Sequence, residues 1–368
     1  MPNLSASGSQ ANVTINSSVV KSPSKKGVVV GTGLIALDVV IADGNKADPL
    51  LCAGGTCGNV LIALAYLGWD AFPIARLRDD AASKRIREDL SAWGVKLDFV
   101  TQSDTGSTPV VIQHIHSAES GRTHSYSRKC PACGAWLPWY KAVLANTVPE
   151  LTPRLPKMDV FYFDRTSRGA IDLAQSARAA GALIFFEPSA ESDANHLKEA
   201  LELAHIVKVA SDRLKSNEAL LSAKSPNLII ETMGSRGLRY SSSLRSERRI
   251  WKTLPPYKID AVRDSSGAGD WCTAAIISSL GRLGPSGLKN VHQDVIQSAL
   301  ELGQAMAAWT CQYDGARGGM YTSSKERFFN FVKGISKGKK KVATSAAPKA
   351  SKIRRITPIW CDECLGGI

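Results

Sequence analysis

The amino-acid sequence predicts an α/β protein in which helices cover both faces of a mainly parallel β-sheet. The chain has 368 residues, enough for one large domain with a buried core, and 44% of them are hydrophobic against 21% charged. Short β-branched or aromatic segments alternate with helix-like segments along most of its length. Glycine-rich turns follow several of these strands, and ligands bind at such strand ends in parallel sheets.

The elements follow in chain order from a first strand that begins near Val28. Residues 1–27 are rich in Ser, Asn and Lys and lack a central apolar run, so we expect a disordered leader and no secretory signal. Further strands are predicted at 71–76, 108–116, 122–127, 159–163, 182–186, 206–209 and 227–231. Helices are predicted at 60–68, 83–93, 168–180, 194–204, 271–280 and 294–313.

The segment from Gly31 to Ala36 formally fits the glycine fingerprint of dinucleotide-binding proteins. In that fingerprint the third small residue lies inside a helix, and an acidic residue follows about twenty residues later. Here the chain continues as the β-branched segment 37–41, and no acidic residue stands at the expected place. The sequence therefore argues against a nicotinamide cofactor. What remains is a strand that leads to one carboxylate, Asp38.

The heptapeptide Asp264–Asp270 holds three small residues, Gly267, Ala268 and Gly269, between its terminal carboxylates. An apolar helix is predicted to begin where it ends. A glycine-rich turn that opens a helix presents unpaired N–H groups, which stabilise a phosphate or a developing negative charge. An aspartate at that point suits proton abstraction next to a phosphoryl group. The alternative is that Asp270 is an ordinary helix cap.

A second glycine-rich turn, Gly54-Gly55, leads through Asn59 into an apolar helix. Glycines permit close approach of a ligand, and an asparagine amide offers both a donor and an acceptor. Such paired polar groups suit the hydroxyl groups of a polyol. The alternative is a tight turn with an Asn cap.

The cysteines suggest a metal site. Of eight in total, Cys130 and Cys133 form one C-x-x-C pair, and Cys361 and Cys364 form another. Each pair resembles a knuckle whose turn brings two thiolates to one metal, so together they predict a structural Cys₄ zinc site. Two independent thiol pairs are the alternative. The other four cysteines, Cys52, Cys57, Cys272 and Cys311, have apolar neighbours and are expected to be small core residues.

The formal net charge of +13 is concentrated towards the C-terminus. Residues 333–355 contain nine Lys or Arg and no acid among Ser, Ala, Gly and Pro, so we expect a basic flexible linker that leads to a cysteine knuckle at 356–368. The remaining body is only mildly basic, which favours a solvated tail over a specific nucleic-acid partner. No stretch offers the roughly eighteen apolar residues of a membrane span. We therefore expect a cytoplasmic protein without a membrane partner.

Four segments resemble the motifs of the ribokinase or phosphofructokinase-B (PfkB) family of carbohydrate kinases. Three are described above, and the fourth, Thr232–Gly237, is a glycine-containing loop between two strands, for which a plain hairpin is the alternative. Asp264–Asp270 is similar to the family's C-terminal signature, and Gly54–Asn59 to its N-terminal one. Gly33–Asp38 is similar to the strand end that supplies a sugar-binding acid, and Thr232–Gly237 to the nucleotide loop. The resemblance covers about residues 28–332.

The resemblance implies a ribokinase-like three-layer αβα sandwich with a mainly parallel sheet and a small β-strand lid. The lid strands are expected at about 38–50 and 108–127. Lid strands of this family often mediate dimers, so a homodimer is possible here. The family also implies an ATP-dependent transfer of phosphate to a hydroxyl group of a sugar or sugar-like substrate, with Mg²⁺ at the phosphates.

The resemblance also implies roles for individual residues. Asp270 would be the general base, and the backbone amides of 267–270 would form an anion hole. The sugar hydroxyls would be held by Asp38, Gly54, Gly55 and Asn59. The nucleotide site would be lined by Thr232, Gly234 and Gly237. Asp264 would help to bind a monovalent cation.

The chain departs from the family pattern at three places, one of which is Arg78-Asp-Asp-Ala-Ala-Ser, where a glycine-containing turn is more common. Glu187-Pro188-Ser189 stands where Asp-Pro-Asn is common, and Ala210-Ser-Asp-Arg-Leu stands where the family has Asn-x-x-Glu. Two rival functions stay open: a nucleoside kinase on the same scaffold, and a non-catalytic binding or regulatory protein that keeps the fold.

Overall fold

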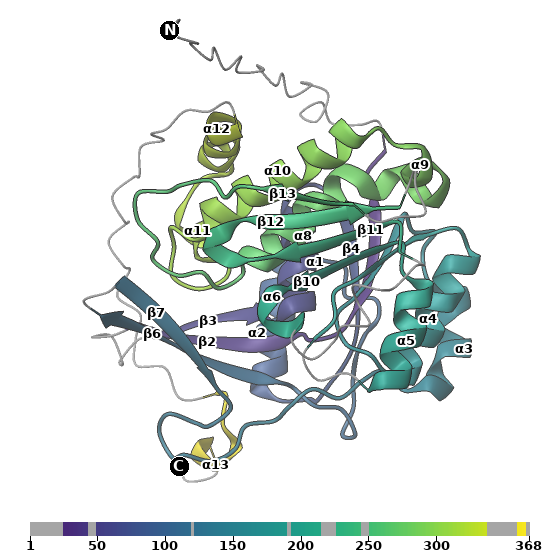
Figure 1. The fold of residues 1–368 in the computed structure, drawn as a ribbon. Helices are drawn as coiled ribbons and strands as arrows, with labels where there is room; N and C mark the ends of the chain where they lie inside the picture. The colour runs from purple at the N-terminus through teal and green to yellow at the C-terminus, as the bar shows by residue number, and fades with distance from the viewer. Residues whose placement is uncertain are drawn as a thin grey trace, which may run out of the picture.

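A computed structural model of the chain describes residues 25–42, 49–118, 121–189, 193–214, 226–243, 250–336 and 359–365. Within these ranges the strands form two sheets, one of nine strands and one of four (Figure 1). The larger sheet is the body of the molecule, and the smaller one projects from it beside the carboxyl end of the first strand.

The large sheet is parallel over most of its width. Its strand order is β13-β12-β11-β10-β9-β8-β1-β4-β5, and every pair from β11 to β5 runs parallel. Its strands are β1 (Val28–Thr32), β4 (Asp70–Leu77), β5 (Val100–Gln102), β8 (Val160–Phe163), β9 (Leu183–Phe186), β10 (Ile206–Ala210), β11 (Leu228–Thr232), β12 (Leu238–Ser242) and β13 (Trp251–Leu254). The two antiparallel strands, β12 and β13, form one edge.

Helices cover both faces of this sheet, which confirms the predicted three-layer fold. Successive residues of β8 point to opposite faces, so Tyr162 packs in one hydrophobic cluster while Phe161 and Phe163 pack in the other. The first cluster includes α1 (Thr56–Tyr66), α2 (Ala81–Ala92), α8 (Ala268–Leu280), α10 (Gln293–Thr310) and α12 (Lys325–Ser336). The second includes α3 (Val148–Leu151), α4 (Arg168–Ala179) and α5 (Ala194–Leu203). Shorter helices are α6 (Ser211–Leu214), α9 (Gly284–Asn290), α11 (Gly318–Thr322) and α13 (Asp362–Leu365).

The small sheet has the strand order β3-β2-β6-β7. It contains β2 (Ala36–Ala42), β3 (Leu50–Gly54), β6 (Val110–Ala118) and β7 (Gly121–Ser127). Strands β6 and β7 form the antiparallel hairpin that the sequence predicts, and β2 runs parallel to β6. Ala36 is the first residue of β2 and not part of a helix, so the dinucleotide fingerprint is rejected, as expected.

The ends of the chain fall partly outside the described residues. Of the expected leader, residues 1–24 lie outside them, while Gly27 already packs on the body and accepts the Asp70 N–H at 2.9 Å. The expected linker at 333–355 is corrected at its start, because α12 continues to Ser336 and makes the first four residues helical. Its remainder, residues 337–355, lies outside the described ranges.

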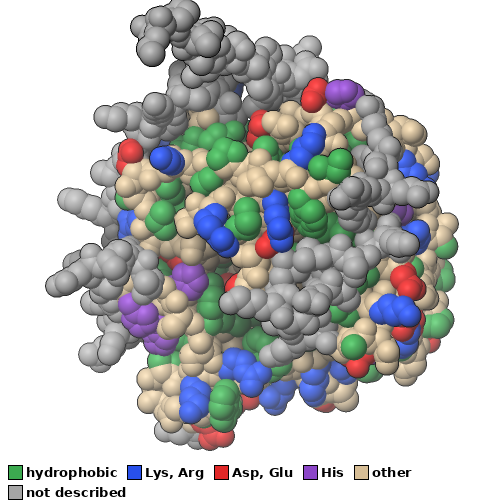
Figure 2. Space-filling model, in the orientation of Figure 1, with side chains coloured by type: hydrophobic (Ala, Val, Ile, Leu, Met, Phe, Trp, Pro, Cys, Tyr) green, Lys and Arg blue, Asp and Glu red, His purple; other side chains and the backbone are tan. Residues whose placement is uncertain are grey.

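The helices and the surface charge bear on whether a membrane or a polyanion is a partner. None of the described helices is long and apolar enough to cross a membrane. Figure 2 shows one face of the molecule, on which Lys and Arg side chains lie at several separate places between acidic and apolar side chains. On this face the positive charge is therefore not gathered into one continuous patch.

Candidate active site

The glycine-rich turn before α8 has the conformation that only glycine adopts easily. Gly267 is the N-cap residue, with φ of 74°, and α8 begins at Ala268, earlier than the sequence places it. Asp270 is therefore the third residue of the helix. No side chain caps the helix, so the alternative that Asp270 is an ordinary cap is wrong.

The first turn of α8 presents backbone N–H groups in front of the helix. The first intrahelical hydrogen bond runs from the Trp271 N–H to the Gly267 carbonyl at 2.9 Å, so the N–H groups of Gly269 and Asp270 precede it. The Ala268 N–H donates a long bond of 3.3 Å to the Ser265 carbonyl. With the positive end of the helix dipole behind them, these groups suit an anion.

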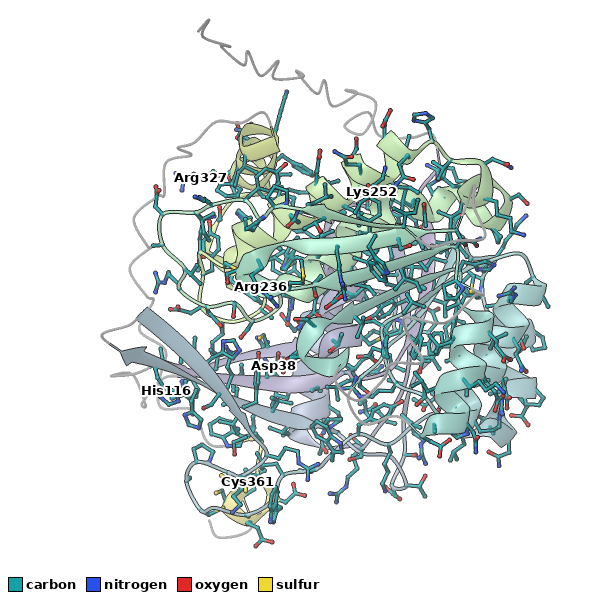
Figure 3. The ribbon with its side chains drawn as sticks, viewed as in Figure 1. Asp38, His116, Arg236, Lys252, Arg327 and Cys361 are labelled. Atoms are coloured by element: carbon teal, nitrogen blue, oxygen red, sulfur yellow. The ribbon has the colours of Figure 1, made fainter. Side chains whose placement is uncertain are left out.

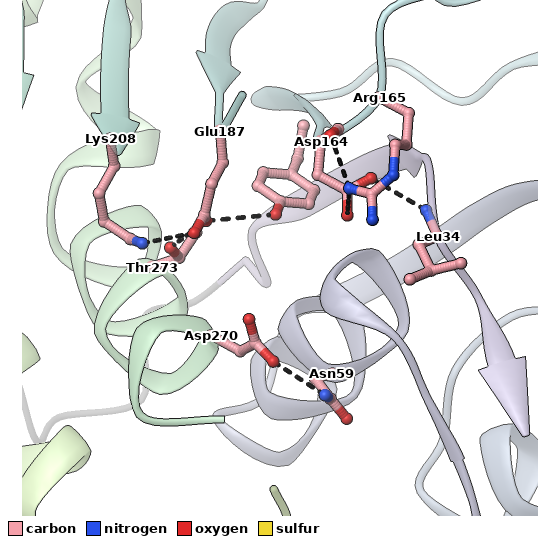
Figure 4. Close-up of polar contacts among 9 residues, drawn as sticks. Leu34, Asn59, Asp164, Arg165, Glu187, Lys208, Asp270 and Thr273 are labelled. Atoms are coloured by element: carbon pink, nitrogen blue, oxygen red, sulfur yellow. Dashed lines mark hydrogen bonds and ion pairs between the residues drawn. The ribbon is translucent and has the colours of Figure 1, made fainter. Parts of the chain in front are cut away.

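Asp270 faces Asn59 at the start of α1, across the junction of the two helices (Figure 4). The Asn59 Nδ2 group donates a hydrogen bond of 2.8 Å to Asp270 Oδ2. Burial of the carboxyl group, together with the negative charge of Glu187, raises the pKa of Asp270 to about 8, although Asn59 and Lys208 act against this shift. The structure thus joins the predicted base to the predicted substrate-binding amide.

A buried ion pair that the sequence analysis missed lies beneath the anion-binding turn. Lys208 of β10 is 1% exposed, and its Nζ lies 2.5 Å from Oε1 of Glu187, which follows β9. The other carboxylate oxygen accepts hydrogen bonds from Thr273 at 2.7 Å and from Tyr162 at 3.4 Å. A Cβ built on Gly269 would lie 3.6 Å from Lys208 Nζ and 4.0 Å from Glu187 Oε1, so this ion pair lies directly below the first turn of α8. The sequence feature that could have revealed this ion pair is a lysine inside the otherwise apolar strand β10.

Asp38 lies in β2, on the side where the small sheet meets the body (Figure 3). Gly54 stands beside it with no room for a side chain, since a Cβ there would lie 1.9 Å from Asp38 Oδ2. Gly55 has φ of 75°, and a Cβ would lie 2.5 Å from the Leu34 carbonyl oxygen. Burial raises the pKa of Asp38 to about 7, against the opposing effect of Arg317. Both glycines of the predicted turn are sterically required.

Arg317, also missed by the sequence analysis, fixes the orientation of Asn59. It is 1% exposed, and its Nε donates to Asn59 Oδ1 at 3.1 Å. Its guanidinium group also donates to the Ala53 carbonyl and, at 2.8 Å, to the buried carboxylate of Asp89. With Oδ1 engaged in this way, the Nδ2 group of Asn59 is the one that meets Asp270.

Asp164 fixes the entry into the small sheet. This buried residue follows β8, and its Oδ1 accepts the Leu34 N–H at 2.9 Å just before β2. A Cβ on Gly33 would lie 1.6 Å from the same oxygen, so only glycine allows this contact. This contact fixes the start of β2, the strand that carries Asp38.

The small sheet reaches the turn before α8 through the buried carboxylate of Asp264. That carboxylate accepts bonds from Gln113 of β6 at 2.6 Å and from the Gly315 N–H at 2.9 Å, and His124 of β7 lies 3.0 Å away. Burial alone would raise the pKa of Asp264, but hydrogen bonds, with those from His124 and Ser266 foremost, lower it to about 2. Asp264 is therefore a charged anchor between the β6–β7 hairpin and the glycine-rich turn before α8.

The predicted nucleotide loop lies at the carboxyl end of β11. Thr232 ends that strand in register with Ala210 of β10, and Gly234 and Gly237, both with positive φ, turn the chain into β12. A Cβ on Gly237 would lie 2.3 Å from the Leu254 carbonyl oxygen. The observed strand, loop and antiparallel strand agree with the predicted elements, and they leave both the nucleotide loop and the plain hairpin open.

The two C-x-x-C pairs meet in space. The four sulfur atoms of Cys130, Cys133, Cys361 and Cys364 lie within 4.8 Å of one another, and we call them the four-cysteine cluster. Of the four cysteines expected in the core, Cys52, Cys57 and Cys272 are buried and Cys311 is partly exposed.

Replacing Gly267 by Ala is expected to lower kcat by about 10- to 100-fold, because the turn must move to make room. The added Cβ would lie 2.5 Å from the Cβ of Ala316, and φ would remain unfavourable. Gly181→Ala is the matched control, since Gly181 has φ of 87° but open space around it. Steady-state kinetics measures the difference, and equal kcat values in the two variants would contradict the expectation.

Comparisons with known proteins agree with this geometry. The family model described as "pfkB family carbohydrate kinase" matches residues 32–136 and 165–323. A fructokinase of Klebsiella pneumoniae is 26% identical over 272 residues, which cover 67% of this chain and 83% of that enzyme.

Solved structures show the same fold at lower identity. The fructokinase of Xylella fastidiosa with bound ATP has a TM-score of 0.65 at 19% identity and covers 85% of this chain and 100% of that chain. The aminoimidazole riboside kinase of Salmonella enterica, complexed with aminoimidazole riboside and an ATP analog, has a TM-score of 0.61 at 18% identity. It covers 83% of this chain and 100% of that chain.

Proposed function

The chain belongs to the pfkB family of carbohydrate kinases, and from this premise we propose that it transfers the γ-phosphoryl group of ATP to a hydroxyl group of a free sugar, with Asp270 as the general base. The observation that carries the proposal is the hydrogen bond of 2.8 Å between Asn59 and Asp270. It brings a sugar-type recognition group, a base with a raised pKa and an anion-binding turn to one point.

The residues divide the work by their chemistry. Asp38 and Asn59 orient the hydroxyl groups, and the Asp270 carboxylate accepts the proton of the hydroxyl that attacks. The first-turn amides of α8 stabilise the negative charge of the group in transfer, and Lys208 adds positive potential below them. The β6–β7 hairpin acts as a lid that excludes water, since its contacts with Asp264 tie it to the catalytic turn.

ATP and Mg²⁺ are implied by the family, and the residues present fit the phosphate groups of ATP. A helix N-terminus that opens with a left-handed glycine presents its first-turn N–H groups as donors for phosphate oxygens. Thr232, Gly234 and Gly237 lie at the carboxyl end of the same sheet and would line the nucleotide. When bound, Mg²⁺ supplies charge neutralisation at the phosphates. Asp264, together with carbonyl groups near residues 315–318, would help to bind a monovalent cation.

A substrate panel tests the proposal. Purified protein with ATP and Mg²⁺ should release ADP in the presence of one or more pentoses or hexoses and not without an acceptor. Keto-deoxy acids and nucleosides, including aminoimidazole riboside, complete the panel, because a relative on the same fold is a riboside kinase. Turnover confined to nucleosides would replace the sugar kinase by a nucleoside kinase. No turnover with any acceptor would favour the catalytically degenerate homologue.

A further inference from the structure

The spacing of the sulfur atoms in the four-cysteine cluster is that of a metal site. Cys130 and Cys364 have their sulfur atoms 3.7 Å apart, and those of Cys133 and Cys361 lie 3.6 Å apart. A disulfide needs about 2.05 Å. Zinc–sulfur bonds of about 2.3 Å place the sulfur atoms of a tetrahedral site about 3.8 Å apart. Two of the six sulfur–sulfur distances therefore already match the edge length of a Cys₄ zinc site, and all six are within 4.8 Å.

The backbone around the first pair is shaped to support thiolates. The N–H groups of Ala132 and Cys133 donate hydrogen bonds to the sulfur of Cys130. The Gly134 N–H donates to the Cys130 carbonyl at 2.9 Å, and the Cys130 N–H donates to the Ala135 carbonyl at 2.8 Å. Gly134 has φ of 78°, as the close of such a knuckle requires. N–H groups directed at a ligand sulfur are the outer contacts that a metal thiolate site uses.

The second pair repeats this arrangement at the other end of the chain. The Cys364 N–H donates to the sulfur of Cys361, and the Leu365 N–H donates to the Cys361 carbonyl at 3.1 Å. Trp360 and Cys361 are buried in the same hydrophobic cluster as α1 and α8. The carboxylate of Asp362 lies 3.0 Å from the guanidinium group of Arg78, a residue of the loop before α2. The terminal segment is therefore packed against the body as well as against Cys130.

We propose that the four-cysteine cluster binds one Zn²⁺ ion, which fastens the C-terminal segment 359–365 to the root of the lid. Partners 228 and 234 residues apart are joined at this point, so the ion closes a very long loop. Figure 3 shows Cys361 beneath the lid hairpin. Cys130 follows the last residue of β7 by three positions, and β7 carries His124 and Tyr126, which contact Asp264 and Ser266. The ion therefore fixes the end of β7, and the side chains of β7 contact the turn before α8.

Metal analysis of the full-length protein, purified without chelators, tests the site directly. We expect about one zinc per chain, released in step with the modification of four thiols by a mercurial reagent. A Co²⁺-loaded protein should show the intense visible bands of tetrahedral thiolate coordination. Less than about a fifth of an equivalent of zinc, or iron in its place, would overturn the proposal.

Substitution separates the cluster from adventitious binding. Cys361→Ser with Cys364→Ser should abolish zinc binding, whereas Cys311→Ser, which removes a partly exposed cysteine outside the cluster, should leave it unchanged. Zinc retained by the double variant would refute the assignment. Because zinc content does not depend on turnover, this result stands whether or not the protein phosphorylates a sugar.

Hydrogen exchange tests the connection to the lid. In the double variant, amides of β7 should exchange at least about 10-fold faster than in the zinc-loaded protein, while those of the central strand β8 stay unchanged. Similar exchange of β7 in both proteins would show that the ion does not support the lid.

Discussion

Asp270→Asn is expected to lower kcat by about 10²- to 10⁴-fold, because an amide cannot take the proton of the attacking hydroxyl group. The substitution keeps the size of the side chain, and an asparagine oxygen can still accept the bond from Asn59. Sugar-dependent ADP release is the measurement. Asp294→Asn is the matched control, since Asp294 also lies in the first turn of a helix, α10, but its side chain is exposed. A variant that retains more than about a tenth of kcat would remove Asp270 from the role of base.

The raised pKa of Asp270 gives this prediction a pH signature. Only the ionised carboxylate accepts a proton, so kcat/KM should rise with pH and level off above about 8. The residual activity of Asp270→Asn should lack this rising limb. A profile that is already flat at pH 6 would contradict the assignment.

The same shift predicts that the inactive variant is the more stable protein at high pH. A raised pKa in the folded state means that stability from proton binding is complete below about pH 4 and is lost as pH rises through about 8. Asp270→Asn removes the buried charge, so its free energy of unfolding at pH 9 should exceed that of the wild type by on the order of 2 kcal/mol. Denaturant unfolding at pH 5 and pH 9 makes the comparison.

Lys208→Met is expected to lower the free energy of unfolding by about 3–5 kcal/mol, because it leaves Glu187 buried without its cation. Adding Glu187→Gln should restore most of that loss, since a neutral amide can keep the bond from Thr273. Lys198→Met, on the exposed side of α5, is the control. Urea unfolding measures all four proteins. A free energy of unfolding for Lys208→Met within about 1 kcal/mol of the wild type would contradict the expected cost.

The pair also has an expected kinetic effect that stability alone does not explain. Lys208 Nζ stands below the first turn of α8, so kcat should stay low in the double variant even where the fold is restored. Recovery of full kcat in that variant would assign Lys208 a purely structural role.

Most strands and helices could be predicted from the sequence because their signals are local. The apolar strands β8 and β9 and the periodic helices α4 and α5 were all expected near their observed positions. The start of α8 was placed too late, since the sequence does not show that Gly267 adopts a positive φ and ends the turn. A backbone conformation of this kind depends on contacts such as that with Ala316.

The candidate site divides in the same way. Asp270 and Asn59 can be predicted because each follows glycines at the mouth of an apolar helix, and Asp38 because it is the one carboxylate in an apolar strand. The order of the motifs carries the rest of that information. Lys208 and Arg317 were missed because their meaning lies in their partners. The partner of Lys208 is 21 residues away, and that of Arg317 at Asp89 is 228 residues away.

The sequence by itself determined the fold class and the family and led to Asp270 as the proposed base, because periodicity and motif order are properties of neighbouring residues. It also supplied both C-x-x-C knuckles. The tertiary structure alone decided between one shared cysteine site and two separate thiol pairs. It also showed that Asn59 points its amide group at Asp270 and that a buried ion pair lies beneath the turn before α8. Each of these depends on distances between residues far apart in the chain, which are set by the packing of the whole sheet and its helices.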